Sequence, residues 1–141
     1  MPSQKDHKEE EFISLILRVA VSSLFAVAAI GKFQKGQAGL EGVVQHFNEM
    51  FKDTWLPPQL VTLQARLIPY IEAVIPVWLI SGIQLKLAWI ATSFYMITLA
   101  FGIMVAGKYD VAAYNYLYVL ICCWGLYFSK YDTFNVDRFT K

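Results

Sequence analysis

The chain has 141 residues, of which 57% are hydrophobic and only 16% are charged. An ordinary soluble domain carries about 25% charged residues, so this balance favours a membrane protein. The net charge of +1 excludes the basic surface that nucleic-acid binding requires. The chain is also too short to hold several membrane spans and a separate soluble catalytic domain.

The charged residues avoid four long stretches of the sequence, in which only Arg18 and Glu72 are charged. An apolar helix of about 20 residues crosses ~30 Å of hydrocarbon, whereas a soluble helix shows water a polar face. The mainly acidic residues 1–11 read as a short solvated tail before the first stretch and lack the positive charge of a secretory signal. We predict an all-α integral membrane four-helix bundle, with spans at about residues 12–33, 64–83, 87–107 and 111–128.

The only long connection follows the first span, and its apolar residues recur at helical spacing. They fall on one face of a helix, which predicts an amphipathic surface helix over about residues 38–52. The sequence Trp55-Leu56-Pro57-Pro58 ends this helix and places an aromatic ring near the entry of the second span. The residues of the stripe are Leu40, Val43, Val44, Phe47, Met50 and Phe51.

The later spans are joined by tight turns at Gln84–Lys86 and Lys108–Asp110. Four spans place both termini on one side of the membrane, and Lys and Arg are slightly more numerous on that side. The positive-inside rule then favours both termini in the cytoplasm, with the protein in a bacterial inner (cytoplasmic) membrane.

Glu72 is the strongest functional signal in the sequence. A carboxylate inside a span is costly unless it is paired or neutralised, so it should face the bundle interior. Pro76 has no N–H to donate to the carbonyl of Glu72, which opens the helix beside the acidic side chain. This spacing predicts a small polar cavity between the first two spans.

Arg18 and Lys32 are the candidate partners of Glu72. They lie about 40° apart on one face of the first span, with Ser22 between them, and roughly 21 Å apart along its axis. Lys32 is at the same membrane end as Glu72 and is therefore the more reachable of the two. Three roles remain open for this intramembrane charge network: fixing helix register, binding a proton or ligand, or contacting a partner subunit.

Other candidates for chemistry are weaker. Cys122 and Cys123 are adjacent, so they point in different directions and cannot easily form a disulfide. His7 and His46 have no cluster of further ligands at metal-binding spacing, so we expect no metal site. We expect Asn115, inside the fourth span, to form a hydrogen bond between helices.

Several short motifs together resemble the DoxX family of small four-span membrane proteins, over about residues 14 to 132. The chain departs from the pattern in its longer acidic N-terminal tail and in Ala29-Ile30 before Gly31. The resemblance implies a four-helix membrane bundle, with functional charges at Arg18, Lys32 and Glu72. The motifs are Leu17-Arg18-Val19-Ala20, Leu24-Phe25, Gly31-Lys32-Phe33, Leu56-Pro57, Ile71-Glu72-Ala73 with Gly82, Asn115-Tyr116-Leu117-Tyr118 and Lys130-Tyr131-Asp132.

For some members the resemblance also implies membership in a membrane oxidoreductase assembly, such as thiosulfate:quinone oxidoreductase. We therefore predict a non-catalytic subunit of a larger membrane redox complex, with the bilayer and other membrane subunits as partners. No covalently bound or metal-ligated cofactor is expected, and a quinone or a lipid is the ligand to consider. The alternatives are a small quinone-linked oxidoreductase and a proton- or small-molecule-conducting bundle centred on Glu72.

Overall fold

A computed structural model describes residues 4–133, and their side chains from residue 8 onward. Four of its helices are long and apolar enough to cross a membrane. The predicted all-α membrane bundle is therefore confirmed. The helices are α1 (Gln4–Phe33), α2 (Gly36–Phe51), α3 (Pro58–Ser81), α4 (Leu85–Val105) and α5 (Tyr109–Phe128), followed by the short 3₁₀ turn η1 (Ser129–Tyr131).

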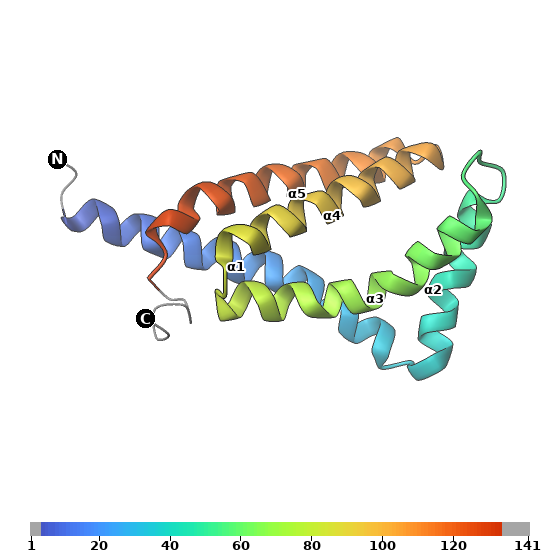
Figure 1. The fold of residues 1–141 in the computed structure, drawn as a ribbon, viewed down its shortest axis with the longest axis horizontal. Helices are drawn as coiled ribbons and strands as arrows, with labels where there is room; N and C mark the ends of the chain where they lie inside the picture. The colour runs from blue at the N-terminus through green and yellow to red at the C-terminus, as the bar shows by residue number, and fades with distance from the viewer. Residues whose placement is uncertain (1–3, 134–141) are drawn as a thin grey trace.

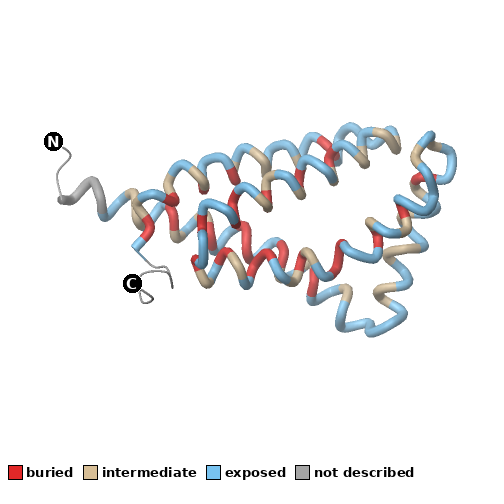
Figure 2. The backbone as a smooth tube through the Cα atoms, viewed as in Figure 1, coloured by how far each residue is buried: buried red, intermediate tan, exposed pale blue. Residues whose placement is uncertain are grey.

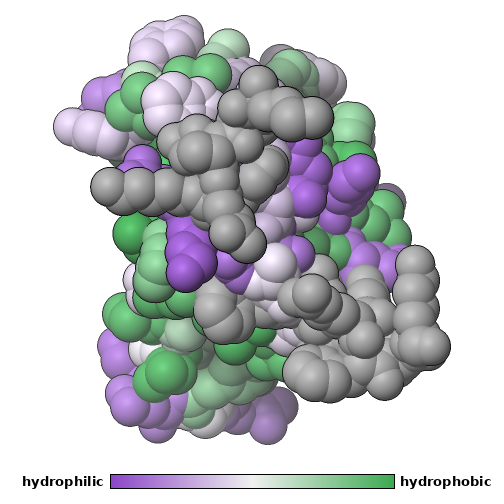
Figure 3. All heavy atoms as spheres, turned by 90° about the vertical axis from the view of Figure 1, so that its left-hand side faces the viewer, coloured by the Kyte–Doolittle hydropathy of each residue, from purple (hydrophilic) through white to green (hydrophobic). Residues whose placement is uncertain are grey.

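The four long helices form two pairs, and α2 closes one end of the bundle (Figure 1). The most extensive contacts join α4 to α5 and α1 to α3, and α2 packs on α3 and α1. α2 runs across the direction of the long helices, at the end opposite the termini of the chain. The end that holds the termini presents a mixture of hydrophilic and hydrophobic side chains (Figure 3). Mixed polarity suits the two ends of a membrane bundle, which lie at the membrane surfaces.

The turns between the spans depend on left-handed backbone conformations. Gly82 ends α3 with a φ of 70°, and its N–H donates to the carbonyl of Trp78 at 3.2 Å. Glycine takes this conformation without the Cβ clash that other residues meet there. Gln84 then adopts a φ of 45°, so α4 begins at Leu85 and runs back along the bundle. This close reversal places the end of α3 beside the beginning of α4.

The core contains few residues, and large apolar side chains cover the outside of the bundle. Trp89 and Leu79 are fully buried, whereas Val27, Val77 and Phe94 are each exposed over more than 65% of their surface. In Figure 2 the buried positions lie where the helices face one another, and the exposed positions follow the outer faces. This arrangement is what a lipid environment permits, because apolar side chains on the outer faces then meet hydrocarbon rather than water.

Several helix boundaries differ from those predicted. α1 is helical from Gln4, so residues 4–11 are not a separate tail; Glu and Lys are good helix formers and extend a helix that the span already nucleates. α3 begins at Pro58, six residues before the predicted start, because proline at the first helical position suits a helix N-terminus. Arg66 therefore lies two turns inside α3.

Gly125 of α5 allows the close approach of α4. A Cβ atom at this position would overlap the indole ring of Trp89, which is fully buried. We predict that Gly125→Ala lowers the free energy of unfolding in detergent by about 1–3 kcal/mol, the usual cost of overpacking a core. Thermal unfolding measures the effect. The control is Gly31→Ala, because nothing lies within 4 Å of a Cβ there; equal shifts in the two variants would contradict the prediction.

Candidate functional site

Arg18 of α1 is buried at the end of the bundle that holds the termini, and its guanidinium contacts two other segments of the chain, the end of α3 and the segment after α5. Its Nη1 donates to both carboxylate oxygens of Asp132, at 3.0 and 2.9 Å. Its Nε donates to the carbonyl of Leu79 at 2.8 Å, and its Nη2 to that of Ile80 at 2.6 Å. The hydroxyl of Ser14 donates to the same Asp132 carboxylate at 2.8 Å. We call these residues the Arg18 clamp.

The clamp donates hydrogen bonds to backbone carbonyls at the end of α3 that have no partner within the helix. The last carbonyls of a helix have no partner within the helix, and they carry the negative end of its dipole. Arg18 reaches two carbonyls in the last turn of α3 from the neighbouring α1. Because Arg18 is only 2% exposed and Asp132 9%, neither charge is left to hydrocarbon without its opposite. The clamp is a structural joint between α1, α3 and the segment after α5.

The second charged pair lies nearer the α2 end of the bundle. Lys32, in the last turn of α1, donates to the carboxylate of Glu72 on α3. The side chains are 25% and 10% exposed, so this pair is less enclosed than the Arg18 clamp. The sequence predicts this contact, because Lys32 lies closer than Arg18 to the membrane end of Glu72.

The Lys32–Glu72 pair lines a cavity of about 480 Å³ that all five helices help to form. His46 of α2 and Asn115 of α5 add further polar groups to its wall. The remaining wall is mostly apolar and includes Phe47, Ile68, Val111, Leu99 and Ile103. A site with a few polar groups in an apolar surround is the usual form of a small-molecule pocket.

Tyr95 of α4 is a further polar residue that packs against the core of the bundle, although the sequence did not single it out. Its hydroxyl is buried and has no hydrogen-bond partner among the described residues. The centroids of the Tyr95 and Phe25 rings lie 5.9 Å apart. A lone tyrosine in an apolar span gives no sequence signal for a polar role.

The three predicted charges do not form one network. Glu72 pairs with Lys32, and Arg18 pairs with Asp132, which entered the sequence analysis only through the resemblance. The predicted polar cavity between the first two spans also needs correction, because the Lys32–Glu72 cavity is shared by five helices. Pro76 instead lines a separate apolar groove of about 610 Å³ between α1 and α3. Small side chains on α1 leave that groove open, and they supply no polar groups.

The remaining candidates have distinct surroundings. The hydroxyl of Ser22 is buried without a hydrogen-bond partner among the described residues, so it makes no bond between helices there. Cys122 is buried and Cys123 exposed, and both are free thiols. Within residues 4–133, as far as they are described, no group of three His, Cys, Asp or Glu side chains could hold a metal ion. The side chain of His7 lies outside the described part of the chain.

Comparison with known proteins identifies the family of the chain. A family model described as DoxX matches residues 13–105, well over half of the chain. The matched part holds Arg18, Lys32 and Glu72, and it ends with α4, before Asn115 and Asp132. No characterised protein and no solved structure matches the chain.

The Arg18 clamp predicts a large stability effect at Asp132. Removing its carboxylate leaves a buried guanidinium without a counter-charge, which costs about 3–5 kcal/mol. We expect Asp132→Ala to lower the unfolding temperature strongly in detergent, whereas Asp110→Ala, at an exposed position in the first turn of α5, costs less than about 1 kcal/mol.

A double variant tests whether the loss comes from the unpaired charge. Arg18→Met combined with Asp132→Ala should be more stable than Asp132→Ala alone, because no unpaired charge then remains. If Asp132→Ala had the same unfolding temperature as the Asp110→Ala control, the clamp would contribute little to stability.

Proposed function

Because the chain belongs to the DoxX family of membrane proteins, we propose that it is a non-catalytic subunit of a larger membrane redox complex. In this proposal the Lys32–Glu72 cavity receives the head of a quinone. The observation that carries the proposal is the Lys32–Glu72 pair itself, a partly exposed charge pair on a cavity with apolar walls. A pair that served only helix register would have no need of an open cavity beside it.

The residues of the cavity fit a quinone head. Quinone oxygens accept hydrogen bonds, and the Lys32 ammonium and the Asn115 amide are donors on the cavity wall. Phe47, Leu99 and Ile103 offer apolar contact to the ring. The volume of about 480 Å³ lies within the range of small-molecule sites. A bound quinone would supply the electron-carrying chemistry to the complex.

Glu72 orients the cation of this site. Its carboxylate accepts a hydrogen bond from Lys32 and so holds the ammonium on the wall of the cavity. The Lys32 side chain retains 25% exposure, which leaves it accessible to a ligand.

The outer surface of α5 supports the subunit part of the proposal. Its span buries 17% of its residues inside the molecule, against 33% for α1 and α3. Tyr114, Leu117, Leu120 and Trp124 are all more than half exposed along this helix. In a membrane, helices associate through packing of such faces rather than by exclusion of water, so α5 is the span most open to a neighbouring subunit.

The test isolates the tagged protein from its native membrane in mild detergent. Mass analysis identifies the chains that purify with it, and solvent extraction measures quinone per protein. We expect other membrane chains in the sample and a quinone content that falls about tenfold in Glu72→Gln and Lys32→Gln, the size expected from losing one charge-assisted hydrogen bond. The matched controls are Asp110→Asn and Lys108→Gln, two exposed charges at the same end of the bundle.

A charge swap separates binding from helix register. Lys32→Glu combined with Glu72→Lys keeps an ion pair, so the unfolding temperature should recover while the quinone content stays low. If the unfolding temperature and the quinone content both recovered, the ion pair would serve only to fix the register of α1 and α3. A monodisperse, partner-free protein that turns over substrate by itself would overturn the subunit role, and unchanged quinone in both single variants would overturn the cavity assignment.

A further inference from the structure

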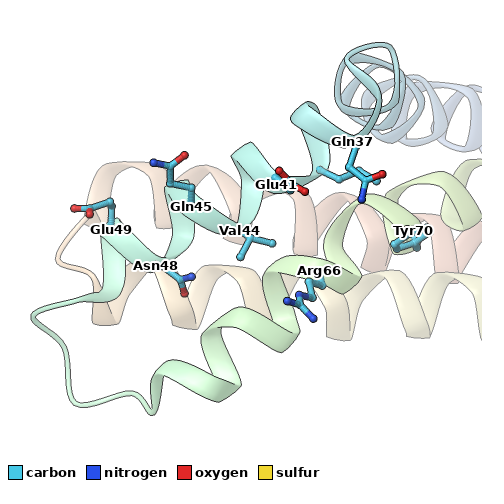
Figure 4. Close-up of a pocket in the computed structure, with 9 residues that line it drawn as sticks. Gln37, Glu41, Val44, Gln45, Asn48, Glu49, Arg66 and Tyr70 are labelled. Carbon is cyan, nitrogen blue, oxygen red and sulfur yellow. The ribbon is translucent and has the colours of Figure 1, made fainter.

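A second groove lies between α2 and α3, outside the Lys32–Glu72 cavity. It has a volume of about 640 Å³. Arg66 and Tyr70 of α3 line one wall, and a row of mostly polar side chains of α2 lines the other. Figure 4 shows Val44 and Asn48 of α2 directed towards the part of α3 that carries Arg66. The Thr62 hydroxyl donates to the Asn48 side chain at 2.9 Å, which joins the two helices at this groove.

Arg66 is an exposed cation at the edge of the apolar surface. It forms no ion pair with any residue in the described part of the chain. The apolar run of the second span begins directly after it, at Leu67, and α3 exposes Leu63, Leu67 and Val74 to the outside. Although Arg66 lies two turns inside α3, its long side chain can extend towards the near membrane surface, where the phosphate of a lipid headgroup is the available anion.

The opposite wall carries one carboxylate that is also unpaired. Glu49 pairs with Lys52 at 3.2 Å, so these two charges cancel. Glu41 is exposed and forms no ion pair with a described residue. The groove thus presents one unpaired cation and one unpaired carboxylate, with the neutral amides of Gln37 and Asn48 beside them. This charge pattern complements a zwitterion that carries both a phosphate and an ammonium.

We propose that this groove binds a single glycerophospholipid with a primary ammonium in its headgroup, of the phosphatidylethanolamine type. Its phosphate contacts Arg66, and its ammonium donates to Glu41 and to the amide oxygens of the groove. Its acyl chains follow the exposed apolar stripe of α3. A purely anionic headgroup leaves Glu41 facing negative charge, and a choline headgroup has no N–H to donate. The site is independent of the quinone proposal.

The test measures lipid retention by the full-length protein, delipidated in detergent, with native mass spectrometry. The probes are dioleoyl phosphatidylethanolamine, phosphatidylcholine and phosphatidylglycerol at equal concentration. We expect the ethanolamine lipid to be retained most, and its retention to fall about tenfold in Arg66→Gln. Arg66→Lys should keep part of it, because the charge remains, and Glu41→Gln should remove the preference over phosphatidylcholine. Lys108→Gln, an exposed cation at the same end but outside the groove, should change nothing.

Circular dichroism and thermal unfolding establish that each variant is folded before its retention is compared. Unchanged retention in folded Arg66→Gln would overturn the site. Equal retention of phosphatidylglycerol and phosphatidylethanolamine would overturn the zwitterion assignment. Full displacement of the lipid by equimolar free phosphoethanolamine would show that the groove recognises a soluble headgroup rather than a lipid, and would overturn the lipid as its occupant.

Discussion

A charge inside hydrocarbon is tolerated only when an opposite charge and hydrogen-bond partners accompany it, and Arg18 of α1 finds them on two other segments of the chain. Its guanidinium takes the carboxylate of Asp132 and two carbonyls from the last turn of α3. Because these partners lie on different elements, this one side chain ties α1 to the last turn of α3 and to the segment after α5. It therefore joins the two helix pairs at the end that holds the termini.

The other end of the bundle is built differently. There the Lys32–Glu72 pair lies on an open cavity, and further inside the bundle the buried hydroxyl of Tyr95 has no hydrogen-bond partner among the described residues. Unsatisfied polar groups reduce stability, and they are tolerated where a ligand or proton uses them. A bundle with a closed clamp at one end and an open charged cavity at the other can keep its helices in place while it binds and releases a small molecule. This contrast is the physical basis of the quinone proposal.

The outside of the bundle offers surfaces for both proposals. The outer faces of α3 and α5 expose apolar side chains along much of their length, and the α2–α3 groove sets a cation and a carboxylate beside such a face. α2 crosses the bundle end and contributes to both the Lys32–Glu72 cavity and this groove. One amphipathic helix thus lines both sites. In the two proposals, the position of α2 on the bundle therefore affects the binding of the quinone and of the lipid.

The sequence by itself determined the fold class, the four spans and the amphipathic helix, and it singled out Arg18, Lys32 and Glu72 as charges that need partners, because hydropathy and intramembrane charge are properties of local sequence. It also favoured Lys32 as the partner of Glu72, since helix rise converts residue numbers into depth along one axis. Only the tertiary structure decided that Arg18 pairs with Asp132, that Tyr95 packs against Phe25 in the core and that Arg66 faces α2 across a groove. These are contacts between helices, and their rotation and lateral packing are set by side chains distant in sequence. No periodicity within one segment encodes them.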